Sequence, residues 1–346
     1  MKKIVDLRSD AVTLPTDEMQ EAMKKAKVGD DEFGEDPTVN YLEQISAELT
    51  GKKAGLFVPS STMANLIAIL VYIHRDDGII VGSKAHIYDH EYPGIIKIAG
   101  IQYHPIKERK IGFRAKDLVQ EIEQNKCLSS SRVSLVAIEN THNRTGGTVM
   151  TSQKTSSIVK IGKKYGIPVY LDGARIFNAA VALGVEIKEL TKDVDSLSFC
   201  LSKALAAPVG SVLVGPTKFI KEARRVRWML GGAMKQSGVL AAAGIVGLKT
   251  MVKRIIKDHK RARLLAEELS AMNGINIDVE FVQTNLILMN VRRSGFSIEE
   301  FLNQMTINGV KAVRSGDKIR LAVHKDISDD DIDYVLTMVR RILRAQ

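Results

Sequence analysis

The sequence predicts an α/β fold, in which a large domain with a mostly parallel sheet is followed by a small α+β domain. Between residues 55 and 215, short apolar runs alternate with loops and helical segments, which is the pattern of successive βαβ units. Beyond Gly274 the pattern changes to short strands and amphipathic helices. A length of 346 residues also suits two domains. We expect an N-terminal arm and the large domain over residues 1–250, and a connecting helix with the small domain over residues 251–346.

Hydrophobic periodicity and capping residues place the individual elements. Short apolar runs are typical of buried strands, and apolar residues that recur every three or four positions are typical of helices that bury one face. Strands are expected at residues 56–58, 79–81, 133–138, 167–171, 197–201, 210–214, 286–291 and 319–323. Helices are expected at 17–27, 38–50, 63–73, 116–124, 152–165, 217–228, 239–272, 298–308 and 329–345, and in the Ala-rich segment after Arg175.

The composition argues against several functional classes. The net charge is +10, but 50 Lys and Arg lie among 40 Asp and Glu without a long basic run, so a solvated surface explains the charge better than nucleic-acid binding does. An anionic substrate or a phosphate-bearing cofactor is the next explanation. The longest apolar run, residues 66–73, is too short to span a membrane.

The two cysteines and the N-terminus favour a cytoplasmic protein. Cys127 and Cys200 are too few for a disulfide framework or a zinc cluster, which fits a reducing compartment. The first three residues are followed by only Ile4 and Val5 before Asp6, so we expect no signal peptide.

Two predicted strands end in residues that carry chemistry. Asp172 follows the run at 167–171, and Lys203 follows the run at 197–201. Ligands of α/β sheets bind beyond the carboxyl ends of the strands, so the two side chains are expected at the mouth of one crevice. A lysine and an acid in this arrangement suit pyridoxal phosphate (PLP), which forms a Schiff base with the lysine while the acid keeps its pyridine nitrogen protonated. A structural ion pair is the commoner explanation of this spacing when it is taken alone.

Other polar clusters follow strands as well. Ser60, Ser61 and Thr62 begin a strongly apolar helix, where such residues cap free amides and where a phosphate can bind. His86, with His90 and Glu91, allows a metal site or a ring that stacks on a flat cofactor, but the HExxH order of a zinc helix is absent and we predict no metal. A further cluster, residues 139–144, contains His142. A single His at a strand end is more often a structural residue, so only the joint pattern favours a site.

Eight segments resemble the L-threonine aldolases, which are PLP enzymes of the aspartate-aminotransferase fold, also called fold type I. The segments occur in the same order over residues 6–325, and they read DLRSD, GEDP, VPSSTMAN, ENTHNR, LDGARIFNAAVALG, CLSKALAAPVGS, GGAMKQSG and RLAVH. The resemblance implies a seven-stranded, mainly parallel sheet in the large domain. It also implies a homotetramer (a dimer of dimers), or at least a dimer, with active sites at subunit interfaces.

The resemblance implies roles for individual residues. They fall into groups that hold PLP, bind the amino-acid substrate, or act on its β-hydroxyl group. Lys203 forms the Schiff base, Asp172 pairs with the pyridine nitrogen, His86 stacks on the ring, Ser61 and Thr62 begin the phosphate site, Ser9, Arg175 and Arg320 bind the substrate carboxylate, Arg175 also reaches the ring hydroxyl, and His142 lies beside the β-hydroxyl group.

The sequence departs from the family pattern at several of these positions. Ser61, Ala204 and Ala206 stand where the family usually has Gly, and Lys235 stands where it has an Arg associated with the phosphate, sometimes that of the neighbouring subunit. A Lys replaces the charge of an Arg but not its bidentate fork. Phe33 replaces a Tyr, and Ala11 replaces a Thr. The lysine and the acid are unchanged, so the departures concern substrate preference and efficiency.

The predicted reaction is cleavage of L-threonine or L-allo-threonine to glycine and acetaldehyde. A base must remove the β-hydroxyl proton, and His86, His142 or a water that they hold suits this task because the pKa of a histidine is close to working pH. Another PLP reaction, such as β-elimination or cleavage of phenylserine, is the enzymatic alternative, because the fold does not fix the reaction. A basic, catalytically idle protein that binds nucleic acid is the alternative from another class.

Overall fold

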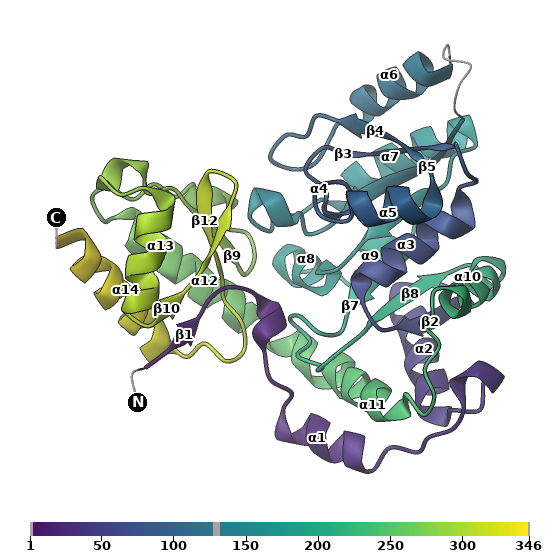
Figure 1. Cartoon of the computed structure of the whole chain (residues 1–346), viewed down its shortest axis with the longest axis horizontal. Coiled ribbons are helices and arrows are strands. Elements are labelled where there is room, and N and C mark those ends of the chain that lie inside the picture. Colours follow the sequence, from purple (N-terminus) through teal and green to yellow (C-terminus); the bar gives the residue numbers. More distant parts are fainter. Residues whose placement is uncertain (1–2, 127–131, 345–346) are drawn as a thin grey trace.

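A seven-stranded sheet organises the larger lobe of the computed structural model, which describes residues 3–126 and 132–344 (Figure 1). The strand order is β2-β8-β7-β6-β5-β3-β4. Only β8 runs against its neighbours, so the predicted seven-stranded, mostly parallel sheet is confirmed. The strands are β2 (Ala54–Val58), β3 (Gly78–Gly82), β4 (Gln102–Ile106), β5 (Val133–Glu139), β6 (Val169–Asp172), β7 (Ser196–Cys200) and β8 (Ser211–Gly215).

Both faces of this sheet are buried, because side chains that alternate along each strand enter two different apolar clusters. In β2, Phe57 belongs to one cluster, whereas Leu56 and Val58 belong to the other. The helices of this lobe are α1 (Asp17–Lys24), α2 (Pro37–Thr50), α3 (Ser61–Tyr72), α4 (His86–Asp89), α5 (Tyr92–Ala99), α6 (Ala115–Lys126), α7 (Ser152–Tyr165), α8 (Ile176–Leu183), α9 (Ile187–Thr191), α10 (Thr217–Met229) and α11 (Gly238–Val246). The sequence patterns missed β4 and α5, which are short and lack strong caps.

The second lobe has its own sheet and core. Its three-stranded antiparallel sheet has the order β11-β12-β9, and a parallel two-stranded ladder joins β1 to β10. A separate apolar cluster contains Leu265, Phe301 and Val339, which lie on the three helices of this lobe. The elements are α12 (Ile255–Ser270), α13 (Ile298–Ile307), α14 (Asp329–Arg344), β1 (Val5–Asp6), β9 (Leu286–Met289), β10 (Val310–Lys311), β11 (Val313–Ser315) and β12 (Lys318–Ala322).

The N-terminal arm connects the two lobes. Val5 and Leu7 are buried in the apolar cluster of the second lobe, and β1 pairs with β10 there (Figure 1). The arm then forms a short 3₁₀ helix, Asp10–Val12, and continues to α1, which packs against α11 (Figure 1). The predicted domain boundary at residue 250 stays a prediction, although the apolar side chains of the arm pack with the C-terminal lobe.

The strand order indicates where in the sheet a ligand can bind. The strands β4 and β5 lie on opposite sides of β3 in the sheet. The chain passes from β3 to its neighbour β4 and then back across β3 to β5, which makes a topological switch at the carboxyl end of β3. Ligand sites of open α/β sheets lie at such switches. In the described part of the chain, no helix is long and apolar enough to cross a membrane.

Candidate active site

The carboxyl ends of four parallel strands bring the predicted residues to one edge of the sheet. Asp172 is the last residue of β6, and Glu139, the last residue of β5, lies opposite it in the ladder. His86 begins α4 just after β3, and Lys203 lies three residues beyond β7, the other neighbour of β6. Asp172, Lys203 and His86 therefore meet at this edge, as their positions in the sequence predicted.

Asp172 is a carboxylate that the fold holds in a nearly water-free position. Its side chain accepts hydrogen bonds from Asn65 Nδ2 and from the backbone N–H of Ala174, both at 3.1 Å. Burial raises its pKa to about 6, the nearby carboxylates of Glu139 and Glu91 contribute, and the charges of His86 and Lys203 oppose the rise. A cationic N–H donor beside Asp172 would stabilise its ionised form.

Asn65 and Glu91 join the candidate residues into one network, which the sequence analysis did not foresee. Asn65 Nδ2 also lies 3.2 Å from both carboxylate oxygens of Glu91, and Asn65 Oδ1 accepts a 2.7 Å hydrogen bond from the hydroxyl of Tyr170. Glu91 accepts a hydrogen bond from Thr62 Oγ1 at 3.1 Å and contacts His86 Nδ1 at 2.8 Å. A buried Asn within the otherwise apolar α3 was the available signal, because such a group needs a partner.

The two histidines have different surroundings. Burial lowers the pKa of His86, but the bond to Glu91 and the charge of Asp172 outweigh this effect and raise it. His142 is 2% exposed, and its Nε2 contacts Glu108 at 3.0 Å, while its buried Nδ1 has no hydrogen-bond partner among the described residues. Burial also lowers the pKa of His142, and Glu139 and Glu108 raise it overall. The ring of His142 is therefore engaged with the carboxylate of Glu108 through Nε2 in this structure.

Glu139 links the loops that carry the two histidines. One of its oxygens accepts the backbone N–H of His86 at 2.7 Å, and the other accepts the backbone N–H of Asn143, the residue after His142, at 2.8 Å. The two loops are therefore fixed relative to the end of β5, although the structure shows no direct contact between the two imidazole rings.

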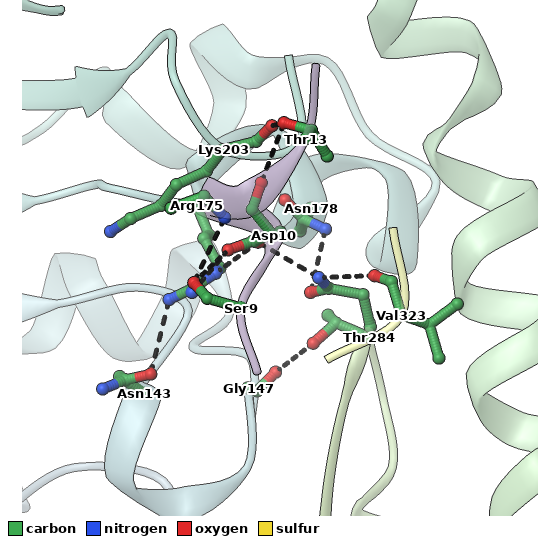
Figure 2. A network of polar contacts seen from close by, with 12 residues as sticks. Ser9, Asp10, Thr13, Asn143, Gly147, Arg175, Asn178, Lys203, Thr284 and Val323 are labelled. Carbon is green, nitrogen blue, oxygen red and sulfur yellow. Dashed lines mark hydrogen bonds and ion pairs between the residues drawn. The ribbon is translucent and has the colours of Figure 1, made fainter. Parts of the chain in front are cut away.

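The predicted carboxylate-binding residues lie where the two lobes meet, and Figure 2 shows Ser9 and Arg175 among them. Arg175 precedes α8, and its Nε and Nη2 donate to the buried carboxylate of Asp10 at 2.7 and 2.8 Å. Arg320, on β12 of the second lobe, donates from Nη1 to Asn143 Oδ1 at 2.8 Å. Ser9 caps the 3₁₀ helix of the arm, where its Oγ accepts the backbone N–H of Ala11. The structure thus brings Ser9, Arg175 and Arg320 into one area, and it adds Asp10 and Asn143, which the sequence analysis did not single out.

The predicted phosphate residues are divided between two places. Ser61 and Thr62 are the first residues of α3, whose N-cap is Ser60, so the free amides of this helix begin beside Glu91. Lys235 lies elsewhere, in an exposed ion-paired cluster with Asp30 and Glu32. Among the described residues, Lys235 shares no hydrogen bond or ion pair with the other predicted site residues.

No group of three or more His, Cys, Asp or Glu side chains in the described ranges is arranged to hold a metal ion. Cys200 is buried as a free thiol at the end of β7, and Cys127 lies outside the described residues.

The side chains at the crevice fit PLP. Asp172 is a buried acid whose hydrogen-bond donors are all uncharged, α3 presents a helix N-terminus that suits a phosphate, and Lys203 supplies an amine at the adjacent strand end. An α/β fold with this set of groups defines the class of fold-type I PLP enzymes.

Comparisons with known proteins agree with this class. A family model described as "Beta-eliminating lyase" matches residues 6–292, and the chain belongs to that family. It is 41% identical over 344 residues to "Low-specificity L-threonine aldolase 1" of Arabidopsis thaliana, with 98% of this chain and 96% of the relative covered. It is 39% identical over 341 residues to "Low specificity L-threonine aldolase" of Escherichia coli strain K12, with 98% and 99% covered. The predicted resemblance is confirmed.

A solved structure supports the fold. A crystal structure described as a "putative L-allo-threonine aldolase" from Listeria monocytogenes has a TM-score of 0.81 at 19% identity, with 98% of this chain and 96% of that chain covered. At this identity the likeness concerns the fold alone, and it confirms the predicted fold type I.

Proposed function

We propose that this protein is a PLP-dependent aldehyde-lyase that cleaves L-threonine or L-allo-threonine to glycine and acetaldehyde. The observation that carries the proposal is the position of Lys203 and Asp172 at the carboxyl ends of the adjacent strands β7 and β6. The identity of 41% to a low-specificity L-threonine aldolase over almost the whole chain supports the reaction type.

The proposed cofactor site uses groups at three strand ends. Lys203 binds PLP covalently, and Asp172 accepts a hydrogen bond from the protonated pyridine nitrogen. His86 stacks on the ring, with its Nδ1 held by Glu91. The phosphate lies at the N-terminus of α3, where Ser61 and Thr62 offer backbone amides and hydroxyl groups. Lys235 adds a positive charge to the phosphate of this subunit or of a neighbour.

The proposed substrate site lies between the lobes. Arg320 and Arg175 both donate to Asn143 Oδ1. Ser9, on the arm, lies close to Arg175 (Figure 2). Guanidinium groups suit the α-carboxylate of an amino acid because they donate parallel hydrogen bonds. Arg175 is also available to the ring hydroxyl.

The reaction needs an electron acceptor and a base. PLP, when bound, supplies the acceptor for the electron pair of the Cα–Cβ bond. Asp172 keeps the pyridine nitrogen protonated, because a buried carboxylate is stabilised by the N–H cation beside it. The β-hydroxyl proton passes to His86, to His142 or to a water that they hold. His86 is half-exposed and its Nδ1 is fixed by Glu91, so Nε2 is the nitrogen available for this transfer.

Product analysis and peptide mapping test the proposal. We expect the wild-type protein to convert L-threonine or L-allo-threonine to equal amounts of glycine and acetaldehyde, without 2-oxobutyrate. Borohydride treatment is expected to fix PLP to Lys203 alone. Lys203→Ala should lose this label and nearly all turnover, whereas Lys188→Ala, at an exposed position on α9, should retain both. 2-Oxobutyrate as the main product would contradict the reaction, and a label on another lysine would contradict the site.

We further propose that the protein is a cytoplasmic homotetramer, formed as a dimer of dimers. Phe33, Trp228 and Met229 are 74%, 61% and 73% exposed. Trp228 and Met229 end α10 shortly before the loop of Lys235, and the Phe33 ring lies near the Lys235 amine. Large exposed apolar side chains of this kind support a subunit interface near the loop. Sedimentation of the PLP-loaded protein would measure the assembly.

A further inference from the structure

Asp10 is the most deeply buried acid between the two lobes. It has no exposed surface, and its two oxygens accept hydrogen bonds from Nε and Nη2 of Arg175, which is 6% exposed. This two-point contact uses one edge of the guanidinium completely. Burial opposes ionisation of Asp10, but the charge and hydrogen bonds of Arg175, the charge of Lys203 and the hydrogen bond from Asn285 together outweigh it, so the pKa of Asp10 lies well below its usual range.

Nη1 of Arg175 and the second N–H of Nη2 remain for other partners. Its Nη1 lies 3.4 Å from Asn143 Oδ1, which also accepts the 2.8 Å hydrogen bond from Arg320 Nη1. The two guanidinium groups therefore converge on one amide oxygen. Arg320 has no carboxylate partner among the described residues, and its other hydrogen bond goes from Nη2 to the backbone oxygen of Arg8. Burial first, and then the charge of Arg175, lowers the pKa of Arg320 to about 10.

Contacts from both lobes fix Asp10 in place. Asn285, just before β9, donates from Nδ2 to Asp10 Oδ2 at 3.1 Å. Asn178 of α8 donates to Asn285 Oδ1 at 3.2 Å and lies 3.2 Å from Nε2 of His259 on α12. Burial lowers the pKa of His259 to about 4, so its ring is neutral and Nε2 can accept this bond. Figure 2 shows Asp10 with Arg175 on one side and Asn178 and Val323 on the other.

We infer that Asp10 is a positioning residue that gives the two arginines different roles, an inference that rests on the proposed function. By pairing with the Nε/Nη2 edge of Arg175, it neutralises the charge of that side chain and leaves Arg320 as the cation that attracts the α-carboxylate of the amino acid. Arg175 then contributes its remaining N–H groups, on Nη1 and Nη2, as oriented hydrogen-bond donors without a net charge. The two arginines therefore differ in the net charge that they bring to the carboxylate.

Whether each variant binds the substrate α-carboxylate more or less tightly follows from the net charge of the side chains around it. In the wild-type protein, Arg175, Asp10 and Arg320 together carry one positive charge. Asp10→Asn raises this sum to two, and Arg175→Met lowers it to zero and leaves the Asp10 carboxylate without its cation. The double variant Asp10→Asn/Arg175→Met returns the sum to one. All other charges are the same in the four proteins.

Glycine is the probe for this cycle, because it has the α-carboxylate but no β-hydroxyl group. Calorimetry on the PLP-loaded proteins is expected to show tighter glycine binding in Asp10→Asn, by about threefold or more, because charges in a buried site interact strongly. Arg175→Met is expected to bind glycine about tenfold or more weakly. The double variant is expected to lie within about threefold of the wild type, because the charge sum is restored.

The outcomes separate this role from simpler ones. If Asp10 only supported the fold, Asp10→Asn would bind glycine less tightly or unchanged and would lose PLP and thermal stability, and this result would overturn the inference. A double variant as weak as Arg175→Met would also overturn it, because Arg175 would then bind the carboxylate with its charge. Should Asp10→Asn fail to fold, the double variant still decides, since it removes both members of the buried pair.

Failure of the proposed function gives a different result. It appears in the wild-type protein, as glycine binding without formation of acetaldehyde from threonine, whereas failure of the inference appears in the order of the four glycine affinities.

Discussion

Asp172→Asn is expected to stabilise the PLP-free protein while abolishing its function. Burial and the neighbouring carboxylates raise the pKa of Asp172 from 3.8 to about 6. An acid with a raised folded-state pKa destabilises the fold above that pKa and has no such effect below its unfolded pKa. At 1.36 kcal/mol per pKa unit, the shift from 3.8 to about 6 lowers the free energy of unfolding by about 3 kcal/mol at pH 8, where the acid is ionised in both states. At pH 5, where the folded-state acid is largely protonated, the same two pKa values give a loss of about 1.5 kcal/mol.

The change with pH is the quantity to measure. An amide has one acceptor oxygen, so the variant loses one of the two hydrogen bonds from Asn65 and Ala174, at a cost of about 1 kcal/mol that does not depend on pH. Urea unfolding of the PLP-free proteins should show that the free energy of unfolding of Asp172→Asn, relative to the wild type, is about 1.5 kcal/mol greater at pH 8 than at pH 5.

A matched variant of opposite sign provides the control. The ion pair with Arg114 lowers the pKa of Asp117 to about 2, so Asp117→Asn should lose stability at pH 8 rather than gain it. If the free energy of unfolding of Asp172→Asn showed no pH-dependent gain, Asp172 would be solvated or partnered in the PLP-free protein, and the reasoning from burial would be refuted.

Three departures from the family pattern give further predictions. Ala206 has a left-handed backbone (φ 58°) and Ala204 does not, so Ala204→Gly should cost about 1.5 kcal/mol from the lost methyl burial and the added unfolded-state entropy. In Ala206→Gly, the loss of the left-handed backbone strain at this residue, about 1–2 kcal/mol, offsets this cost. Equal free energies of unfolding for the two variants would show that the backbone of Ala206 is not strained. Lys235→Ala is expected to weaken PLP retention severalfold and Lys235→Arg to keep it. Unchanged PLP retention in Lys235→Ala would mean that Lys235 forms only its ion pairs with Asp30 and Glu32 and does not support the phosphate.

Two features of the site could be predicted from the sequence because they depend on strand ends. Parallel strands place their carboxyl ends at one edge, so a residue type at the end of an apolar run is enough to locate Asp172 and Lys203 together. The same logic placed His86 after β3. The mostly parallel large sheet followed from the alternation of strands and helices, which depends on local patterns alone.

The partners of these residues could not be predicted in the same way. Asn65 meets Asp172 across 107 positions of sequence, and Asp10 meets Asn285 across 275. No local periodicity encodes such pairs, because they depend on how the arm, α3 and the second lobe pack. The pattern of β1 was too short to show that the arm joins the core of the C-terminal lobe. His142 illustrates the limit: its place after β5 was readable, whereas its partner Glu108 was not.

The net charge of the chain does not describe the charges near the site. The net charge of +10 pointed first to a solvated surface and then to an anionic substrate or a phosphate-bearing cofactor, whereas the charged groups nearest the candidate site include several buried carboxylates. Asp10, Glu91, Glu108, Glu139 and Asp172 are each no more than 8% exposed. Each of them holds a basic or amide group in a fixed orientation, and together they raise the pKa values of His86 and His142. Buried carboxylates thus fix where the basic and amide groups of the site point. At Asp172, whose pKa is raised by burial, the ionised acid costs folding stability at neutral pH, so its removal is expected to stabilise a protein that no longer works.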